Sequence, residues 1–135
     1  MSVVAYTDGG ARGNPGPAAA GVVILRDGTE VARLKRYLGD SLTNNWAEYQ
    51  ALLMALGEIQ ARGLGEEPIE IRMDSELIVK QMRGEYKVKH VDLKKLNTDA
   101  RILLMKMPQV RFVHIPRTEN KEADALVNEA LDEQM

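Results

Sequence analysis

Residues 2–38 read SVVAYTDGGARGNPGPAAAGVVILRDGTEVARLKRYL, and this stretch decides the fold. Three runs in it are rich in β-forming residues: 2–6, 18–25 and 30–38. The second and third runs flank Asp27-Gly28, a pair that favours a tight hairpin turn between antiparallel strands. The stretch from Asp8 to Pro17 is rich in turn-forming residues. The start of the chain is therefore predicted to be a three-stranded antiparallel meander.

Helical and strand patterns alternate after the meander. We expect helices over about 44–62, 75–84, 92–107 and 123–131, and strands over 69–73 and 110–115. Thr43 or Asn44 is expected to cap the first helix and Asp92 the third. This order predicts an α/β fold with a mixed five-stranded sheet, an antiparallel meander followed by parallel strands, flanked by helices. The pattern leaves the strand order open, and the length predicts one domain over residues 1–135.

The charge of the chain is nearly balanced overall and uneven locally. The net charge is -2, from 18 Lys and Arg against 20 Asp and Glu, so the total does not indicate a nucleic-acid partner. Residues 80–95 nevertheless contain six basic and two acidic side chains, whereas residues 119–135 contain one basic and six acidic. This asymmetry suits a surface for phosphates beside a site for metal, although solvated helix faces are the commoner cause.

The composition also bears on compartment and partners. The chain has no Cys, which excludes disulfides and thiolate metal sites. It begins directly with a strand-like run, and it has no stretch of about 18 apolar residues. We therefore expect a cytoplasmic protein without a membrane partner. Since nothing in the pattern implies an obligate protein partner, we expect a monomer.

Glu48 is the acidic residue with the strongest physical claim to a function. On a helical wheel it falls within the apolar arc formed by Ala51, Leu52, Ala55, Leu56 and Ile59. An ionised carboxylate facing apolar neighbours costs on the order of several kcal/mol unless something compensates its charge. The basic residue on this helix face, Arg62, lies at the far end, so a divalent cation is one candidate. The alternatives are a basic partner from another segment and a partly exposed first turn.

Three further acids are predicted to lie where they can join Glu48. Asp8 and Asp74 follow predicted strands, and Asp124 borders the apolar stripe of the last helix near its start. Because like charges raise one another's pKa, four carboxylates at close range need cations to stay ionised. Hard oxygen ligands favour Mg²⁺ or Mn²⁺, and such a set fits two-metal phosphodiester hydrolysis. The alternative is that the strand-end aspartates act as caps or turn formers.

Four short motifs follow one another along the chain. They are Thr7-Asp8-Gly9 with Asn14-Pro15-Gly16, TNNWAE at 43–48, Met73-Asp74-Ser75, and NKEADAL at 120–126. Taken together and in this order, they resemble type 1 ribonuclease H, and the resemblance runs from about residue 3 to residue 131. It implies a ribonuclease H-like fold and an endonuclease that hydrolyses the RNA strand of RNA/DNA hybrids.

The resemblance also implies roles for individual residues. Two Mg²⁺ ions, with Mn²⁺ as a substitute, would be bound around the scissile phosphate by Asp8, Glu48, Asp74 and Asp124. Contacts to RNA 2′-hydroxyls or adjoining minor-groove atoms match Asn14, Asn44 and Asn45, and a DNA phosphate contact matches Thr43. From the residues alone, the alternatives are a turn at Asn14 and helix capping at 43–45.

The chain departs from the family in two places. Many members carry a basic insertion that grips the hybrid, whereas only residues 85–91 separate Gly84 from Asp92 here, which indicates a compact form. We expect a weaker, salt-dependent grip supplied in part by Lys87, Lys89, Lys94 and Lys95.

The second departure concerns a histidine that much of the family carries on the loop before the last helix. Here that loop reads PRTE at 116–119. His114 lies earlier, in a predicted strand, and is interpreted as structural. Our hypothesis is that Arg117 contacts phosphate in an auxiliary role in place of the missing group.

Three other functions remain open from the sequence. A catalytically silent module would bind hybrids without cutting them. A related nuclease would act on double-stranded RNA or on RNA-DNA junctions, which the compact form makes plausible. A metal-binding structural domain ranks last, because groups suited to phosphate and 2′-hydroxyl recognition would then have no purpose.

Overall fold

The computed structural model describes residues 2–134; residues 1 and 135 of the predicted domain lie outside the described part. The strands are β1 (Val3–Ala11), β2 (Gly16–Arg26), β3 (Thr29–Leu42), β4 (Ile69–Met73) and β5 (Val110–His114). The helices are α1 (Asn44–Ala61), α2 (Glu76–Met82), α3 (Val91–Leu104), the 3-10 turn η1 (Arg117–Glu119) and α4 (Lys121–Asp132). The predicted order of elements is confirmed.

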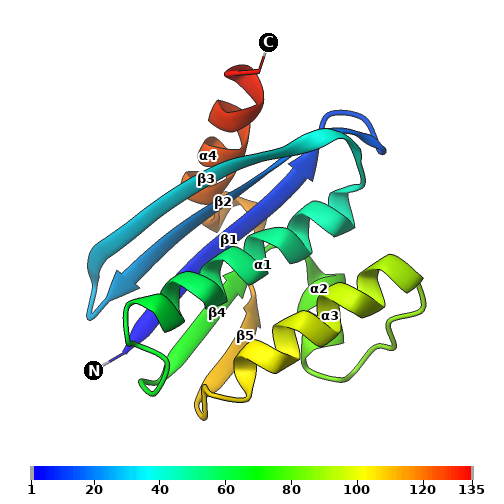
Figure 1. Ribbon diagram of the computed structural model, residues 1–135. Helices are drawn as coiled ribbons and strands as arrows, with labels where there is room; N and C mark the ends of the chain where they lie inside the picture. Colours follow the sequence, from blue (N-terminus) through cyan, green and yellow to red (C-terminus); the bar gives the residue numbers. More distant parts are fainter. Residues whose placement is uncertain (1, 135) are drawn as a thin grey trace.

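The strands form one sheet in the order β3-β2-β1-β4-β5 (Figure 1). The pairs β1–β2 and β2–β3 are antiparallel, whereas β1–β4 and β4–β5 are parallel. The predicted mixed sheet, a meander followed by parallel strands, is thus confirmed. The strand order, which the pattern left open, places β1 at the centre.

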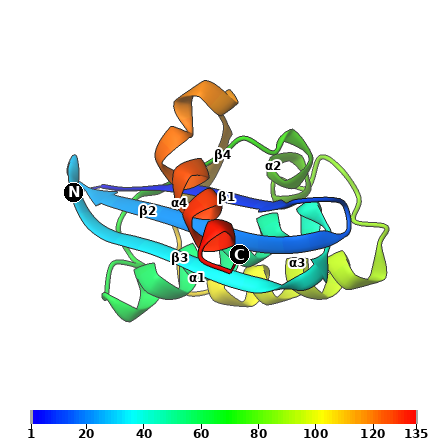
Figure 2. The ribbon, with the colours of Figure 1, turned by 90° about the horizontal axis from the view of Figure 1, so that it is seen from above.

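Helices cover the sheet unevenly. The helices α1 and α3 lie side by side on one face, and α4 packs against β1, β2 and β3 on the other (Figures 1 and 2). The predicted apolar arc of α1 is buried against β1 and β2, and its residues Leu52, Leu56 and Ile59 belong to the same core as Ile71 of β4. Burial of each such side chain contributes about 1.5–3 kcal/mol. Within residues 2–134, no helix is both long and apolar enough to cross a membrane.

Two predicted helix starts are confirmed and one is wrong. The Thr43 hydroxyl accepts a hydrogen bond from the Trp46 N–H (3.2 Å), and Ser75 caps α2 in the same way. Asp92 does not cap α3, because that helix begins at Val91 with His90 as its N-cap residue. Asp92 lies instead in the first turn, where its negative charge interacts favourably with the helix dipole.

The strand β1 is longer than the pattern predicted. Residues 8–10, expected to form a turn, continue the strand and pair with β2 as far as Ala11 opposite Ala18. Asp8 is therefore inside a strand, and the prediction that it lies at a strand end is wrong. The reason is tertiary: the β2 ladder holds the glycine-rich stretch extended. The parallel ladder with β4 ends earlier, at Thr7 opposite Met73, so Asp8 is the first residue beyond it.

Candidate active site

The site forms along the edge of β1 that β4 leaves unpaired. In a strand, the backbone groups of alternate residues point to the same edge, and they need hydrogen-bond partners when buried. Where β4 no longer pairs with β1, three side chains provide these hydrogen bonds. Asn120 Nδ2 donates to the Thr7 carbonyl (2.8 Å). Glu48 Oε1 accepts from the Gly9 N–H (2.5 Å), and Asn44 Oδ1 accepts from the Ala11 N–H (2.8 Å). The end of β4 therefore opens a space that polar side chains of α1 and α4 enter.

Two glycines allow helices on both faces to approach this space closely. A Cβ at Gly9 would collide with the backbone of Ala47, next to Glu48 on α1. A Cβ at Gly21, which lies opposite Asp8 in the β1–β2 ladder, would be 2.5 Å from the carbonyl oxygen of Ala123, next to Asp124 on α4. Carboxylates from the two faces of the sheet can therefore meet at its open centre.

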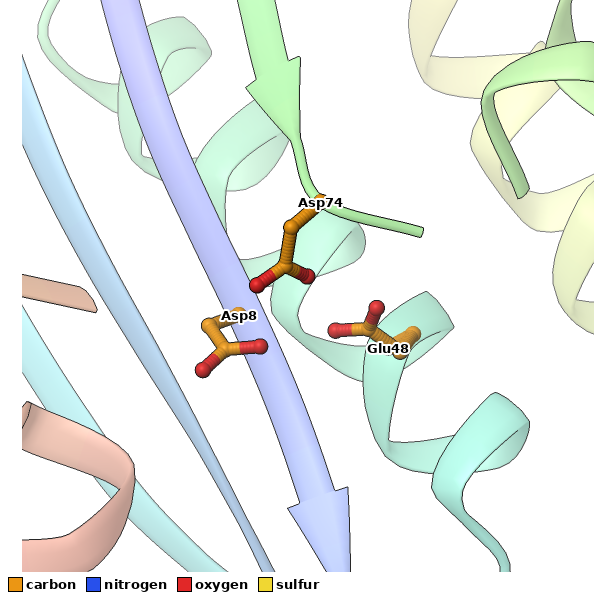
Figure 3. Close-up of side chains that lie close together, drawn as sticks. All are labelled: Asp8, Glu48 and Asp74. Carbon is orange, nitrogen blue, oxygen red and sulfur yellow. The ribbon is translucent and has the colours of Figure 1, made fainter. Parts of the chain in front are cut away.

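Three of the four predicted carboxylates form a tight cluster. One oxygen from each of Asp8, Glu48 and Asp74 lies within 4.8 Å of the others, and the three side chains face a common space (Figure 3). Asp8 is 8% and Glu48 6% exposed. Asp124, at the start of α4, is less buried; its carboxylate lies beside that of Asp8, whose pKa it helps to raise, at the rim of the cluster.

The electrostatics of the cluster favour bound cations. Burial, together with the charges of Asp74 and Asp124, raises the pKa of Asp8 to about 8. Burial and the neighbouring Asp8 and Asp74 carboxylates raise the pKa of Glu48 well above its usual value, although the Gly9 N–H opposes this rise. Burial also raises the pKa of Asp74. Divalent cations would offset the repulsion that keeps protons on these groups, and carboxylate oxygens are the ligands that Mg²⁺ and Mn²⁺ prefer.

The four acids line one cleft of about 550 Å³. Its other polar lining residues include Asn44, Asn45 and Arg117, as predicted, and also Arg12 and Asn128. The latter two were missed by sequence reasoning. Arg12 pairs with Asp132 (2.7 Å) and contacts the Asn128 side chain (3.3 Å), contacts that join the β1–β2 loop to α4 and that no local pattern indicates.

The residues predicted to read nucleic acid lie together beside the cleft. Asn14 Oδ1 accepts a hydrogen bond from the Asn44 N–H (3.0 Å), so the β1–β2 loop is tied to the start of α1. Asn14 and Thr43 line a neighbouring hollow of about 280 Å³, and Asn45 lines both this hollow and the cleft. The structural alternatives are present: Asn14 lies in the bend at 12–15 and Thr43 caps α1, and both side chains still line the hollow beside the cleft.

The basic segment between α2 and α3 adjoins the same residues. Lys87, Lys89 and Tyr86 line a hollow of about 620 Å³ to which Asn45 also belongs. Lys94 and Lys95 are exposed on the first turn of α3. Basic side chains therefore continue from the amides beside the cleft, with Glu85 in the same hollow and Lys95 paired with Asp99 (3.3 Å).

Arg117 and His114 are placed differently. Arg117 lies on the 3-10 turn before α4, lines the cleft, and has a guanidinium nitrogen 3.6 Å from an Asp124 oxygen while its side chain remains 80% exposed. His114 is exposed at the end of β5, opposite Met73, and is outside the part of the cleft lining that the structure describes. Its predicted position in a strand is confirmed.

Comparison with known proteins identifies the family. The family described as Reverse transcriptase-like matches residues 6–130. The ribonuclease HI of Halobacterium salinarum is 46% identical over 132 residues, which are 97% of this chain and 65% of that protein. This chain belongs to the ribonuclease H family. The resemblance to type 1 ribonuclease H found in the sequence motifs is thereby confirmed.

Solved structures share the ribonuclease H fold across the whole chain. LC11-RNase H1, crystallised in complex with an RNA/DNA hybrid, is 48% identical with a TM-score of 0.93, and the alignment covers 98% of each chain.

A bifunctional protein of Mycobacterium tuberculosis is 42% identical over 134 residues, which are 98% of this chain. This ribonuclease H chain spans 36% of the length of that protein.

Proposed function

We propose that this protein is an endonuclease that hydrolyses the RNA strand of RNA/DNA hybrids with divalent metal ions. The observation that carries the proposal is the cluster of Asp8, Glu48 and Asp74, whose ligand oxygens lie within 4.8 Å of one another at the open centre of the sheet. Membership of the ribonuclease H family supports it, as does the RNA/DNA hybrid bound to LC11-RNase H1.

In this proposal the four carboxylates, including Asp124, hold two Mg²⁺ ions, and Mn²⁺ can replace them. When bound, the ions supply the positive charge that phosphodiester hydrolysis requires around the scissile phosphate. The Gly9 N–H orients the Glu48 carboxylate toward the cluster. Arg117 swings from its contact with Asp124 to a substrate phosphate, which its exposed side chain can do without disturbing the core.

Substrate recognition is assigned to the residues beside the cleft. The amides of Asn14, Asn44 and Asn45 suit the 2′-hydroxyl, which both donates and accepts hydrogen bonds and distinguishes RNA from DNA. Thr43 would contact a phosphate of the DNA strand. The lysines of the α2–α3 segment would contact further phosphates of the hybrid, so affinity depends on salt.

A matched pair of variants on one helix tests the proposal. In a Mg²⁺-dependent cleavage assay on an end-labelled hybrid, Glu48→Gln abolishes cleavage, because it removes a ligand from the buried cluster. Glu58→Gln, on the same helix, retains cleavage, because it removes an ion pair with Arg62 outside the site, worth about 0.3–0.5 kcal/mol. Equal activity of both variants would remove Glu48 from the site. Binding of the hybrid without cleavage by the unmodified protein would favour the silent module.

A second candidate substrate comes from the compact α2–α3 connection. Because this connection offers few residues to hold a hybrid, the same four acids would also hydrolyse double-stranded RNA or a single-ribonucleotide junction. The relative rates on the three substrates decide between them, and the fastest turnover is expected on the hybrid. The proposal also includes one catalytic domain over residues 1–135, a monomer and a cytoplasmic location, the last consistent with a chain that contains no Cys.

A further inference from the structure

Asn120 is a buried polar residue to which the sequence motifs assigned no chemical role. Asn120 immediately precedes α4, and only 1% of its surface is exposed. Asn at this position usually caps the helix with its side chain. Within the described residues, Asn120 makes no such side-chain cap of α4, and its Oδ1 has no hydrogen-bond partner. Its amide group therefore makes other contacts, and α4 begins without a side-chain cap.

The side chain and the backbone carbonyl of Asn120 together contact the three segments that carry Asp8, Asp74 and Asp124. The Nδ2 group donates to the Thr7 carbonyl at 2.8 Å, directly before Asp8 on β1. The same side chain is a neighbour of the Asp74 carboxylate, which follows β4, and its amide opposes the rise in the pKa of Asp74 that burial causes. The Asn120 carbonyl accepts from the Asp124 N–H at 3.1 Å, in the first turn of α4. One residue thus contacts β1, the end of β4 and α4.

The position explains why an amide is used. The parallel ladder ends at Thr7 opposite Met73, so the Thr7 carbonyl sits where the two strands separate. A donor is needed there, and the same amide group lies beside the Asp74 carboxylate, whose charged form it favours. An alkyl side chain would leave the Thr7 carbonyl without this donor, and a carboxylate would place an acceptor against that carbonyl and a second negative charge beside Asp74.

We propose that Asn120 is a positioning residue that holds Asp8, Asp74 and Asp124 at the separation at which they bind divalent ions. This inference rests on the proposed function, because it assumes that these carboxylates bind metal. Asn120 itself touches neither ion nor substrate in the proposal. Partners that orient metal ligands typically contribute about 10- to 100-fold to metal affinity or activity.

Substitutions of two buried asparagines test the role. Asn120→Ala and the isosteric Asn120→Asp are compared with Asn97→Ala, which removes a buried amide (8% exposed) that binds the Tyr49 hydroxyl between α1 and α3. Two quantities are measured: the Mn²⁺ concentration at half-maximal thermal stabilisation of the protein without substrate, and kcat and KM on the hybrid. Asn120→Ala and Asn120→Asp each raise that Mn²⁺ concentration by about 10- to 100-fold and lower kcat, with KM for the hybrid unchanged.

The control separates positioning from general stability. Asn97→Ala lowers the melting temperature but leaves the Mn²⁺ concentration unchanged. The proposal is overturned if Asn120→Ala keeps the unmodified Mn²⁺ dependence, or if Asn97→Ala shifts it equally. Should Asn120→Ala fail to fold, Asn120→Asp decides in the same way. If the unmodified protein neither cleaves the hybrid nor is stabilised by Mn²⁺, the proposed function itself is wrong. The Asn120 variants alone cannot give that result, so the two failures are distinguishable.

Discussion

The close approach of α4 to the sheet makes Gly21→Ala an informative perturbation. Gly21 pairs with Asp8 across the β1–β2 ladder, and its Cα faces the backbone of α4 at Ala123. An added Cβ would lie 2.5 Å from the Ala123 carbonyl oxygen and 2.8 Å from the Leu126 Cβ. Both neighbours belong to the helix itself or lie next to its backbone, so no flexible side chain can move aside.

The size of the effect follows from these distances. To reach an ordinary contact distance of 3.4 Å from the present 2.5 Å, the start of α4 must move by about 0.9 Å relative to β2. Asp124 moves with it, away from Asp8. A misplacement of about 1 Å can lower turnover by about 100-fold, and overpacking of this kind costs about 1–3 kcal/mol of stability. Because the residues proposed to contact nucleic acid lie on the α1 side, KM for the hybrid should change little.

The assay combines steady-state cleavage of the hybrid with thermal unfolding. The control is Gly57→Ala in the interior of α1, where an added Cβ meets nothing within 4 Å and alanine should stabilise the helix by about 0.5–1 kcal/mol. A Gly21→Ala variant with unmodified kcat, or a crystal structure of it in which α4 has not moved from β2, would refute the reasoning.

Three further outcomes are expected. In the metal-free protein, burial and the charge of Asp74 raise the pKa of Asp8 from 3.8 to about 8, so the native state keeps a proton that the unfolded state releases. This contribution to stability is complete below about pH 4 and is lost as the pH rises toward about 8. Melting curves of Asp8→Asn should show a smaller decline over this range, because Glu48 and Asp74 also have raised pKa values, and an identical decline would contradict the assignment. Arg117→Ala should lower kcat but not the melting temperature, because its side chain is 80% exposed, and unaltered kinetics would reject the auxiliary role. Lys87→Ala and Lys89→Ala should each reduce the slope of log affinity against log salt concentration by about 1, and a slope that stays the same would exclude these phosphate contacts.

Much of the fold was predictable because its signals are local. The Asp27-Gly28 hairpin, the alternation over 69–73 and the apolar arc of α1 each depend on residues near one another in the chain. Predictions failed where a distant segment decided the local structure. The glycine-rich residues 8–10 became strand because β2 pairs with them, and α3 began at Val91 without the expected side-chain cap.

The candidate site divides in the same way. The inward direction of Glu48 was determined by the sequence itself, because helical periodicity places it among apolar neighbours, and its 6% exposure agrees. The convergence of Asp8 and Asp74 with Glu48 was decided only by the tertiary structure. It requires the β1–β4 ladder to end at Thr7 opposite Met73, which leaves the edge of β1 unpaired from Asp8 onward. The contacts of Asn120 and the close approach at Gly21 join segments about a hundred residues apart, with Asn120 and Thr7 separated by 113 positions. Side-chain periodicity reports a residue's own element, whereas the distances between ligands depend on how closely different elements pack.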